Sequence, residues 1–309
     1  MTKTFGLGWL QRADNAFFAP APAERLAVVR IVIGLFLAAT SVGLLPATLR
    51  THNLGTDAFR PVGVLAPFVA PPPWELVVAI NVVAIAAGLL VAVGWRHTVT
   101  GPLAAAAFLF VSTYRCSWGM IFHSENLLAL HAIVIAFAPA ADAVSIDART
   151  RPTPVASPRY GWPLATLAIL TVAVYFMAGV AKLRGDGLHW AAGEFLRNQI
   201  AFDNVRKAEL GAVYSSIGSA ALAHPALFAP LASASLALEV LAPLALVSWR
   251  TLRIWAIAIV AFHAGILLLM AVAFPYPLTG AAFVGFWPAE RLVIWARARR
   301  NRQPKQNQG

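Results

Sequence analysis

Charged residues and cysteine are both scarce in this sequence. Only 12% of the 309 residues are charged, whereas a typical soluble domain carries about 25%, and 59% are hydrophobic. Such a chain cannot hide its apolar surface from water, so a soluble globular protein is excluded and an integral membrane protein is expected. Cys116 is the single cysteine, which excludes an internal disulfide framework and a cysteine metal cluster.

The signatures of several enzyme classes are also missing. The sequence has no phosphate-binding loop, nucleotide fingerprint or Ser-His-Asp order, and no H-E-x-x-H or H-x-x-x-H spacing, so we expect no metal. The net charge of +11 fits basic cytoplasmic loops of a membrane protein better than a nucleic-acid partner. An ordinary cleavable signal peptide is not expected, because the first long apolar run starts only near Leu26.

Long apolar runs take up most of the chain and predict an all-α, polytopic transmembrane helical bundle. The last run is too short for a span unless it continues past Pro288 towards Trp295. An amphipathic or re-entrant helix is expected after the fifth run. The eight predicted spans are Leu26–Leu45, Trp74–Gly94, Thr98–Tyr114, Leu127–Ala141, Trp162–Leu183, Pro225–Val247, Leu252–Phe274 and Leu278–Trp287.

Three regions follow from this division: an interfacial segment over 1–25, a transmembrane domain over 26–296 and a disordered basic tail over 297–309. With the N-terminus inside, the inner segments hold 15 lysines and arginines and the outer ones 8, which predicts both ends in the cytoplasm. The alternative of seven spans would put the basic tail outside. The long loop between the first two spans is expected to be functional.

The stretch 172–199 is the most informative, because it places Lys182 on the last turn of an apolar helix. Gly185 and Gly187 are expected to break that helix before an amphipathic piece with Trp190, Phe195 and Leu196 on its apolar side. A lysine in hydrocarbon is costly, so its position needs a reason. It either snorkels to the surface, with Asp186 as a partner, or acts as a general base, because desolvation favours the neutral amine.

Other polar residues interrupt the apolar runs. His123 begins H-S-E-N-L-L at 123–128, where Ser124 is the predicted N-cap of the fourth span and Glu125 lies in its first turn. This segment is either a simple interfacial cap or part of a site, and Asn126 adds a further polar group.

Ionisable residues inside the spans are expected to face the bundle interior. His131, Glu239 and His263 are predicted to make buried structural hydrogen bonds, such as one from Glu239 to His263, with metal ligation as the alternative. Arg30 lies close enough to the start of the first span to snorkel. Four outer arginines form either a solvated face or a rim that holds a carboxylate or quinol oxygen: Arg115, Arg184, Arg197 and Arg206.

Several of these motifs resemble a known family. V-Y-F-M-A-G-V-A-K-L at 174–183 resembles the segment of vitamin K-dependent γ-glutamyl carboxylase that carries its catalytic lysine, and W-A-A-G at 190–193 resembles a pair in bacterial horizontally transferred transmembrane (HTTM) domains. The carboxylase has two adjacent lysines there; the second, held to be the base, falls on Lys182, while Ala181 replaces the first. His123-Ser124 matches an Asn-His-Ser motif except at Phe122.

The resemblance covers most of the chain, from L-A-V-V-R-I-V-I-G-L at 26–35 through E-V-L-A-P at 239–243 to F-H-A-G-I at 262–266. It implies a lysine that deprotonates a reduced quinone (vitamin K hydroquinone or menaquinol) before O2 attacks, an epoxide forms, and a strong base enables CO2 to add to a glutamate. Lys182 and His123 would be catalytic. The residues implied to bind substrate or to support the site are Ser124, Asn126, Tyr175, Trp190, Glu239, His263 and Arg184.

The implied protein lies in a bacterial inner membrane with its site towards the outer face, where lipid and quinone reach it laterally. The carboxylase has a large non-membrane region that binds its substrates' propeptide, and the 309 residues hold no counterpart. The resemblance therefore implies quinol-linked oxygenation or epoxidation first, with carboxylation as the other outcome. Two other classes stay open: a maturation factor for a secreted peptide toxin, and a non-catalytic lipid- or quinone-binding membrane protein.

Overall fold

The computed structural model describes residues 11, 14–152 and 154–302, and these residues form helices without a β-strand. The predicted all-α class is therefore confirmed. The chain divides into two compact units, residues 1–167 with 287–309 (unit 1) and residues 168–286 (unit 2). Helix α6 (Pro158–Asp186) begins in unit 1 and continues into unit 2. Residues 1–10, 12 and 13 of the predicted interfacial segment 1–25 lie outside the described residues.

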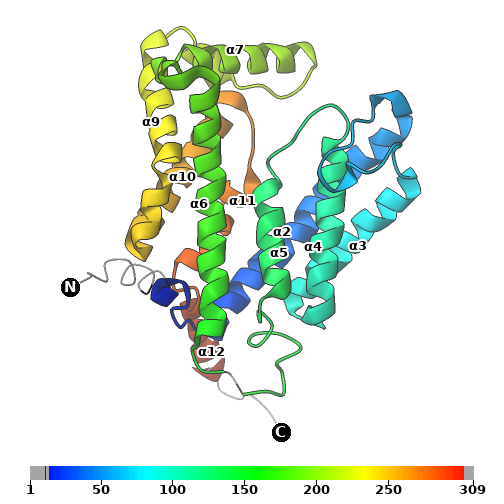
Figure 1. The fold of residues 1–309 in the computed structure, drawn as a ribbon, viewed down its shortest axis with the longest axis vertical. Coiled ribbons are helices and arrows are strands. Elements are labelled where there is room, and N and C mark those ends of the chain that lie inside the picture. Colours follow the sequence, from blue (N-terminus) through cyan, green and yellow to red (C-terminus); the bar gives the residue numbers. More distant parts are fainter. Residues whose placement is uncertain (1–10, 12–13, 153, 303–309) are drawn as a thin grey trace, which may run out of the picture. The chain divides into compact units, whose positions relative to one another are not determined.

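Unit 1 is built on four helices that pack in succession, α2 (Ala23–Arg50), α3 (Trp74–Val93), α4 (His97–Cys116) and α5 (Asn126–Phe137) (Figure 1). Helices α2 and α3 touch through their backbones at two glycines. A Cβ on Gly34 would lie 2.5 Å from the backbone nitrogen of Ala92, and one on Gly88 would lie 2.9 Å from that of Ala38. Small residues permit this close helix packing, which is common inside membranes.

Arg30 is fully buried inside unit 1, so the prediction that it snorkels was wrong. Its guanidinium donates to the carbonyls of Val91 (2.7 Å) and Ala92 (3.1 Å) at the C-terminal end of α3, and to Val144 (2.6 Å). The last carbonyls of a helix lack the usual donor four residues on, so Val91 and Ala92 can accept from Arg30. A cation at a helix C-terminus also interacts favourably with the helix dipole.

The long loop after α2 is ordered by three 3-10 turns, η1 (Thr51–Asn53), η2 (Thr56–Ala58) and η3 (Gly63–Leu65). Phe59 packs edge-on against Trp118, and Trp118 packs against Tyr114 at the end of α4. The backbone nitrogen of Arg60 donates to the carbonyl of Ser117 at 2.8 Å. The loop is thus fastened to α4.

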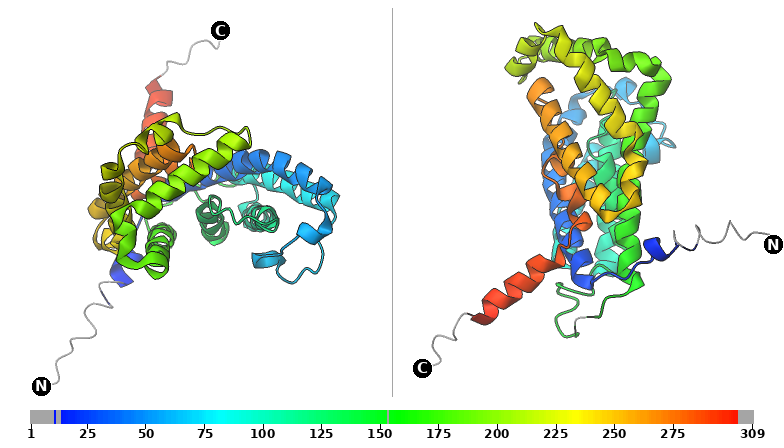
Figure 2. Two further views of the ribbon diagram at one scale, coloured as in Figure 1. Left: turned by 90° about the horizontal axis from the view of Figure 1, so that it is seen from above. Right: turned by 90° about the vertical axis from the view of Figure 1, so that its left-hand side faces the viewer.

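Helix α12 (Glu290–Arg302) projects from the N-terminal end of α2 (Figure 2). Arg25 holds Glu290 with two hydrogen bonds of 2.7 and 2.8 Å, and Arg297 contacts Glu24 at 3.2 Å. The helix includes residues 297–302 of the predicted basic tail, while residues 303–309 lie outside the described residues.

Unit 2 joins the rest of α6 to nine further helical elements. These are η4 (Gly187–Ala192), α7 (Glu194–Glu209), α8 (Ser216–Ala221), η5 (Pro225–Leu227), α9 (Phe228–Val240), η6 (Ala242–Val247), α10 (Trp249–Met270), α11 (Pro275–Leu278) and η7 (Ala281–Phe286). Helix α7 runs across the ends of the others (Figure 1). Asn204, Lys207 and Ser215 donate to the last carbonyls of α10, which lack partners within that helix.

Four helical segments of the described chain are long and apolar enough to cross a membrane, so the eight predicted spans are not confirmed. They are Ala23–Arg50, Trp74–Val93, Pro158–Ala192 and Trp249–Met270. The predicted fourth span shortens to the 12 residues of α5, which rise only about 18 Å against a hydrocarbon core of about 30 Å. The predicted sixth span ends as an α-helix at Val240, before Pro243, and the predicted eighth is replaced by α11 and η7.

Candidate functional site

Lys182 and Glu239 form an ion pair between α6 and α9 of unit 2. The ammonium nitrogen lies 2.7 and 2.6 Å from the two carboxylate oxygens. The Glu239 side chain is only 4% exposed and that of Lys182 is 20% exposed, so the lysine occupies the accessible side of the pair. Glu239, rather than the neighbouring Asp186, is the carboxylate that holds Lys182.

Two glycines bring the backbones of this region together. A Cβ on Gly179 would lie 2.9 Å from the Cβ of Glu239, so α6 and α9 approach closely one turn before Lys182. Gly193 takes a positive φ of 87° and packs against the backbone of Phe228 at the start of α9. The α-helix continues through Gly185, contrary to the prediction, and ends at Asp186, just before Gly187, which has a φ of 60°. The turn after Gly187 returns Trp190 towards α9.

Aromatic rings lie beside the ammonium group. Lys182 Nζ is 5.0 Å from the ring centroid of Trp190 and 5.8 Å from that of Phe262. Trp190 is 9% exposed and packs with Ala232 and Leu236 of α9. Its indole N–H is buried and has no hydrogen-bond partner within the part of the chain that the structure describes. A buried donor without a partner is unfavourable, which sets Trp190 apart from an ordinary core aromatic residue.

A second polar pair lies in the same unit. The Tyr175 hydroxyl is 2.7 Å from Nε2 of His263, which joins α6 to α10. The Tyr175 ring also packs edge-on against Trp255, with 5.2 Å between centroids. The predicted bond from Glu239 to His263 was therefore wrong: Glu239 binds Lys182 and His263 binds Tyr175. The sequence did identify all four polar residues.

The segment that contains His123 belongs to unit 1. Helix α5 begins at Asn126 with Glu125 at its N-cap, so the prediction that Ser124 caps it was wrong. Glu125 instead accepts a hydrogen bond of 2.8 Å from Arg115, whose guanidinium stacks 3.7 Å from the centroid of Phe122. His123 and Asn126 are exposed, and Ser124 is half-buried.

Cys116 is held within this same turn. Its sulfur lies 3.3 Å from both the nitrogen and the oxygen of Phe122. Burial raises the pKa of the thiol, so Cys116 is a poor nucleophile at neutral pH. It has a structural role in the connection between α4 and α5.

The remaining candidates have structural surroundings. His131 is 1% exposed on α5 and bonds to the backbone of Leu167. Arg197 donates to the carbonyl of Leu222 at 3.0 Å, Arg206 pairs with Asp203 at 2.9 Å, and Arg184 is exposed. Within the described residues, no group of three His, Cys, Asp or Glu side chains could hold a metal ion.

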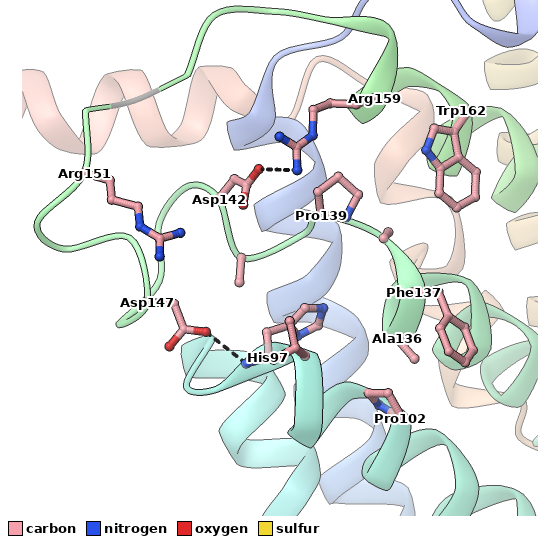
Figure 3. Close-up of a pocket in the computed structure, with 13 residues that line it drawn as sticks. His97, Pro102, Ala136, Phe137, Pro139, Asp142, Asp147, Arg151, Arg159 and Trp162 are labelled. Atoms are coloured by element: carbon pink, nitrogen blue, oxygen red, sulfur yellow. Dashed lines mark hydrogen bonds and ion pairs between the residues drawn. The ribbon is translucent and has the colours of Figure 1, made fainter.

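Sequence reasoning missed a cavity of about 730 Å³ in unit 1 (Figure 3). It lies where the segment between α5 and α6 passes the N-terminus of α4, and its lining includes Phe137, Asp142, Arg151 and Trp162. A smaller cavity of about 260 Å³ shares Asp142 and Arg151. The cluster of arginines in 149–159 was the available signal, but it was interpreted only as a basic inner loop.

Comparison with known families and proteins assigns the chain to a family. A family model described as the HTTM domain matches residues 18–286. Comparison with curated proteins gave no significant match, and comparison with solved structures gave none. The matched region covers most of the chain and includes the Lys182–Glu239 and Tyr175–His263 pairs, and together with the apolar helices it leads to one conclusion. This protein is a membrane protein that belongs to the HTTM-domain family.

Proposed function

We propose that this protein binds a reduced quinone beside Lys182 and removes a proton from its hydroxyl group, as the first step of quinol-linked oxygen chemistry. The observation that carries the proposal is the Lys182–Glu239 ion pair next to the buried, unpartnered indole N–H of Trp190. A plain membrane anchor needs neither the pair nor the donor.

The residues present fit such a molecule. A reduced quinone supplies an acidic hydroxyl and two electrons on a flat ring. The faces of Trp190 and Phe262 offer apolar contact to that ring, and the indole N–H of Trp190 can donate to one of its oxygens. Lys182 would lie beside the same quinol, because its Nζ is 5.0 Å from the Trp190 ring centroid.

The pair, rather than the lysine alone, would act as the base. At rest the ammonium group donates to both oxygens of Glu239 and has no free lone pair. Transfer of one proton from Nζ to the Glu239 carboxylate leaves a neutral amine. The amine then accepts the proton of the quinol hydroxyl, and the enzyme has gained one proton in total.

Four further residues are proposed, from the family resemblance, to contact quinol, O2 or CO2: His123, Ser124, Asn126 and Arg184. Both chain ends are proposed to lie in the cytoplasm of a bacterial inner membrane, with Lys182 towards the outer face. The 15-to-8 distribution of basic residues supports this orientation.

The test is quinol oxidation by the purified, detergent-solubilised full chain, with menaquinol and vitamin K hydroquinone as substrates. Lys182→Arg keeps the charge but cannot release its proton, so we expect loss of turnover with quinol binding retained. Glu239→Gln should lower turnover as strongly, because the first proton has no acceptor. Lys207→Arg, in the same unit but paired with Asp203, is the matched control and should behave like the wild type.

Each result has a defined meaning. Recovery of the Lys182→Ala variant by a small added amine would support the base. Near-wild-type turnover by Lys182→Arg would refute it. If the wild type and all variants bind quinol without oxidising it, the protein is a non-catalytic quinone-binding protein. If Lys182→Ala still supports the maturation of a secreted peptide, Lys182 has no role in the alternative function as a maturation factor.

A further inference from the structure

We propose that unit 1 carries a second binding site, distinct in ligand from the quinol site, for a phosphate group attached to an apolar molecule. The site is the pair of adjoining cavities beside the segment 138–151. The volume of the larger cavity, about 730 Å³, lies in the range of small-molecule pockets, and the smaller one adds about 260 Å³. Asp142 and Arg151 line both, so one ligand can extend from one cavity into the other.

The smaller cavity is basic. Three arginines line it, Arg149, Arg151 and Arg297, against the single carboxylate of Asp142. Arg297 is already engaged by Glu24 at 3.2 Å. Arg149 and Arg151 have no ion-pair partner among the residues that the structure describes, which leaves two positive charges at the cavity.

The carboxylates nearby are occupied by other groups. Asp142 accepts a hydrogen bond of 2.9 Å from the Tyr160 hydroxyl and pairs with Arg159 at 3.1 Å. Asp147 accepts from the backbone nitrogens of Arg96 and His97 at 2.8 and 2.9 Å, where it caps α4. Neither acid forms an ion pair with Arg151. A phosphate group, with several acceptor oxygens, matches two adjacent guanidinium groups.

The larger cavity is apolar on one side. Figure 3 shows Phe137, Trp162 and Pro102 on one side of the cavity and Arg151 and Asp147 on the other. Phe137 ends α5 and is 73% exposed, so its ring is accessible to an apolar group. An apolar chain or ring can lie against this wall while the phosphate group contacts Arg151.

An anionic phospholipid has this chemistry, and basic pockets between transmembrane helices bind such headgroups. A free phosphorylated molecule would share the phosphate contact. The two ligand sources differ in whether apolar contact with Phe137 contributes to binding affinity.

The experiment measures thermal stabilisation and native mass spectra of the full chain in neutral detergent. Phosphatidylglycerol, phosphatidylcholine and inorganic phosphate are added separately. We expect phosphatidylglycerol to stabilise the wild type and Arg151→Gln to weaken its apparent affinity about tenfold. Arg250→Gln removes the same charge from an exposed position outside both cavities and should match the wild type.

Phe137→Ala separates the sources. Phosphatidylglycerol binding that weakens in Phe137→Ala while phosphate binding is unchanged supports a lipid. Phosphatidylglycerol and phosphate binding that are both unchanged in Phe137→Ala, yet both weakened in Arg151→Gln, support a soluble phosphorylated ligand at the same site. The proposal is overturned if phosphatidylcholine stabilises as well as phosphatidylglycerol, if nothing binds, or if Arg250→Gln weakens binding as much as Arg151→Gln.

Discussion

Lys182 and Arg30 are both cations on apolar helices, and the structure satisfies them differently. Lys182 faces a carboxylate and keeps one side accessible, which permits proton transfer. Arg30 is surrounded by carbonyl groups and cannot lose its proton, which makes it structural. The type of partner, rather than the presence of a charge in a helix, separates Lys182, which we propose as a base, from the structural Arg30.

Replacement of Arg30 by Met should destabilise unit 1. The change leaves the carbonyls of Val91, Ala92 and Val144 without their donor in an apolar interior, at a cost of about 2–3 kcal/mol. Thermal unfolding in detergent would measure it. The exposed Arg250→Met is the control, and an equal effect of both variants would show that Arg30 contributes only its charge.

The two glycines of α2 give a comparison at the scale of one helix. Gly34→Ala would place a Cβ 2.5 Å from the backbone of Ala92 and should cost about 1–3 kcal/mol, since α2 and α3 must separate. Gly43 has nothing within 4 Å of its Cβ position, so Gly43→Ala should stabilise α2 by about 1 kcal/mol. Chemical denaturation of both variants checks the opposite signs; a stabilising Gly34→Ala would contradict the packing.

Attachment of α12 should depend on pH through Glu290. Hydrogen bonds from Arg25, opposed by partial burial, hold the pKa of Glu290 below its usual value. A carboxyl with a lowered folded-state pKa stabilises the fold fully above its unfolded pKa, about 4.3, and loses this contribution as the pH falls through the folded value.

The measurement is the difference in melting temperature between wild type and Glu290→Gln. It should correspond to about 1 kcal/mol, stay constant from pH 7 to about 5, and vanish at lower pH. A difference that persists at pH 3 would show that the charge of Glu290 is irrelevant to this attachment.

Helix positions were easier to predict than helix partners. The apolar runs around α2, α3, α6 and α10 were identified from composition alone, because hydrocarbon-length helices need about 20 apolar residues. The bond between Lys182 and Glu239 joins residues 57 positions apart, and no local pattern encodes it. The sequence therefore predicted which residues matter in unit 2 but assigned Lys182 and Glu239 to the wrong partners.

For the whole molecule, the distribution of charge predicts both chain ends in the cytoplasm. Reporter fusions after Arg299 should be active only with a cytoplasmic reporter, because the basic residues of α12 resist export. A fusion in 184–224 should respond to the opposite reporter. Activity of an exported reporter after Arg299 would reverse the assigned orientation.

The burial of Arg30 also constrains how the protein is made. Its acceptors lie 61, 62 and 114 residues further along the chain, so α2 leaves the ribosome long before they exist. During synthesis the nascent α2 carries Arg30 without its final acceptors, which weakens its insertion into lipid. We therefore expect insertion of this first helix to stay reversible until α3 arrives, and to become complete after residue 144 has been translated. Nascent chains arrested before Val91 should accordingly be extractable from the membrane, whereas chains arrested well beyond Val144 should not.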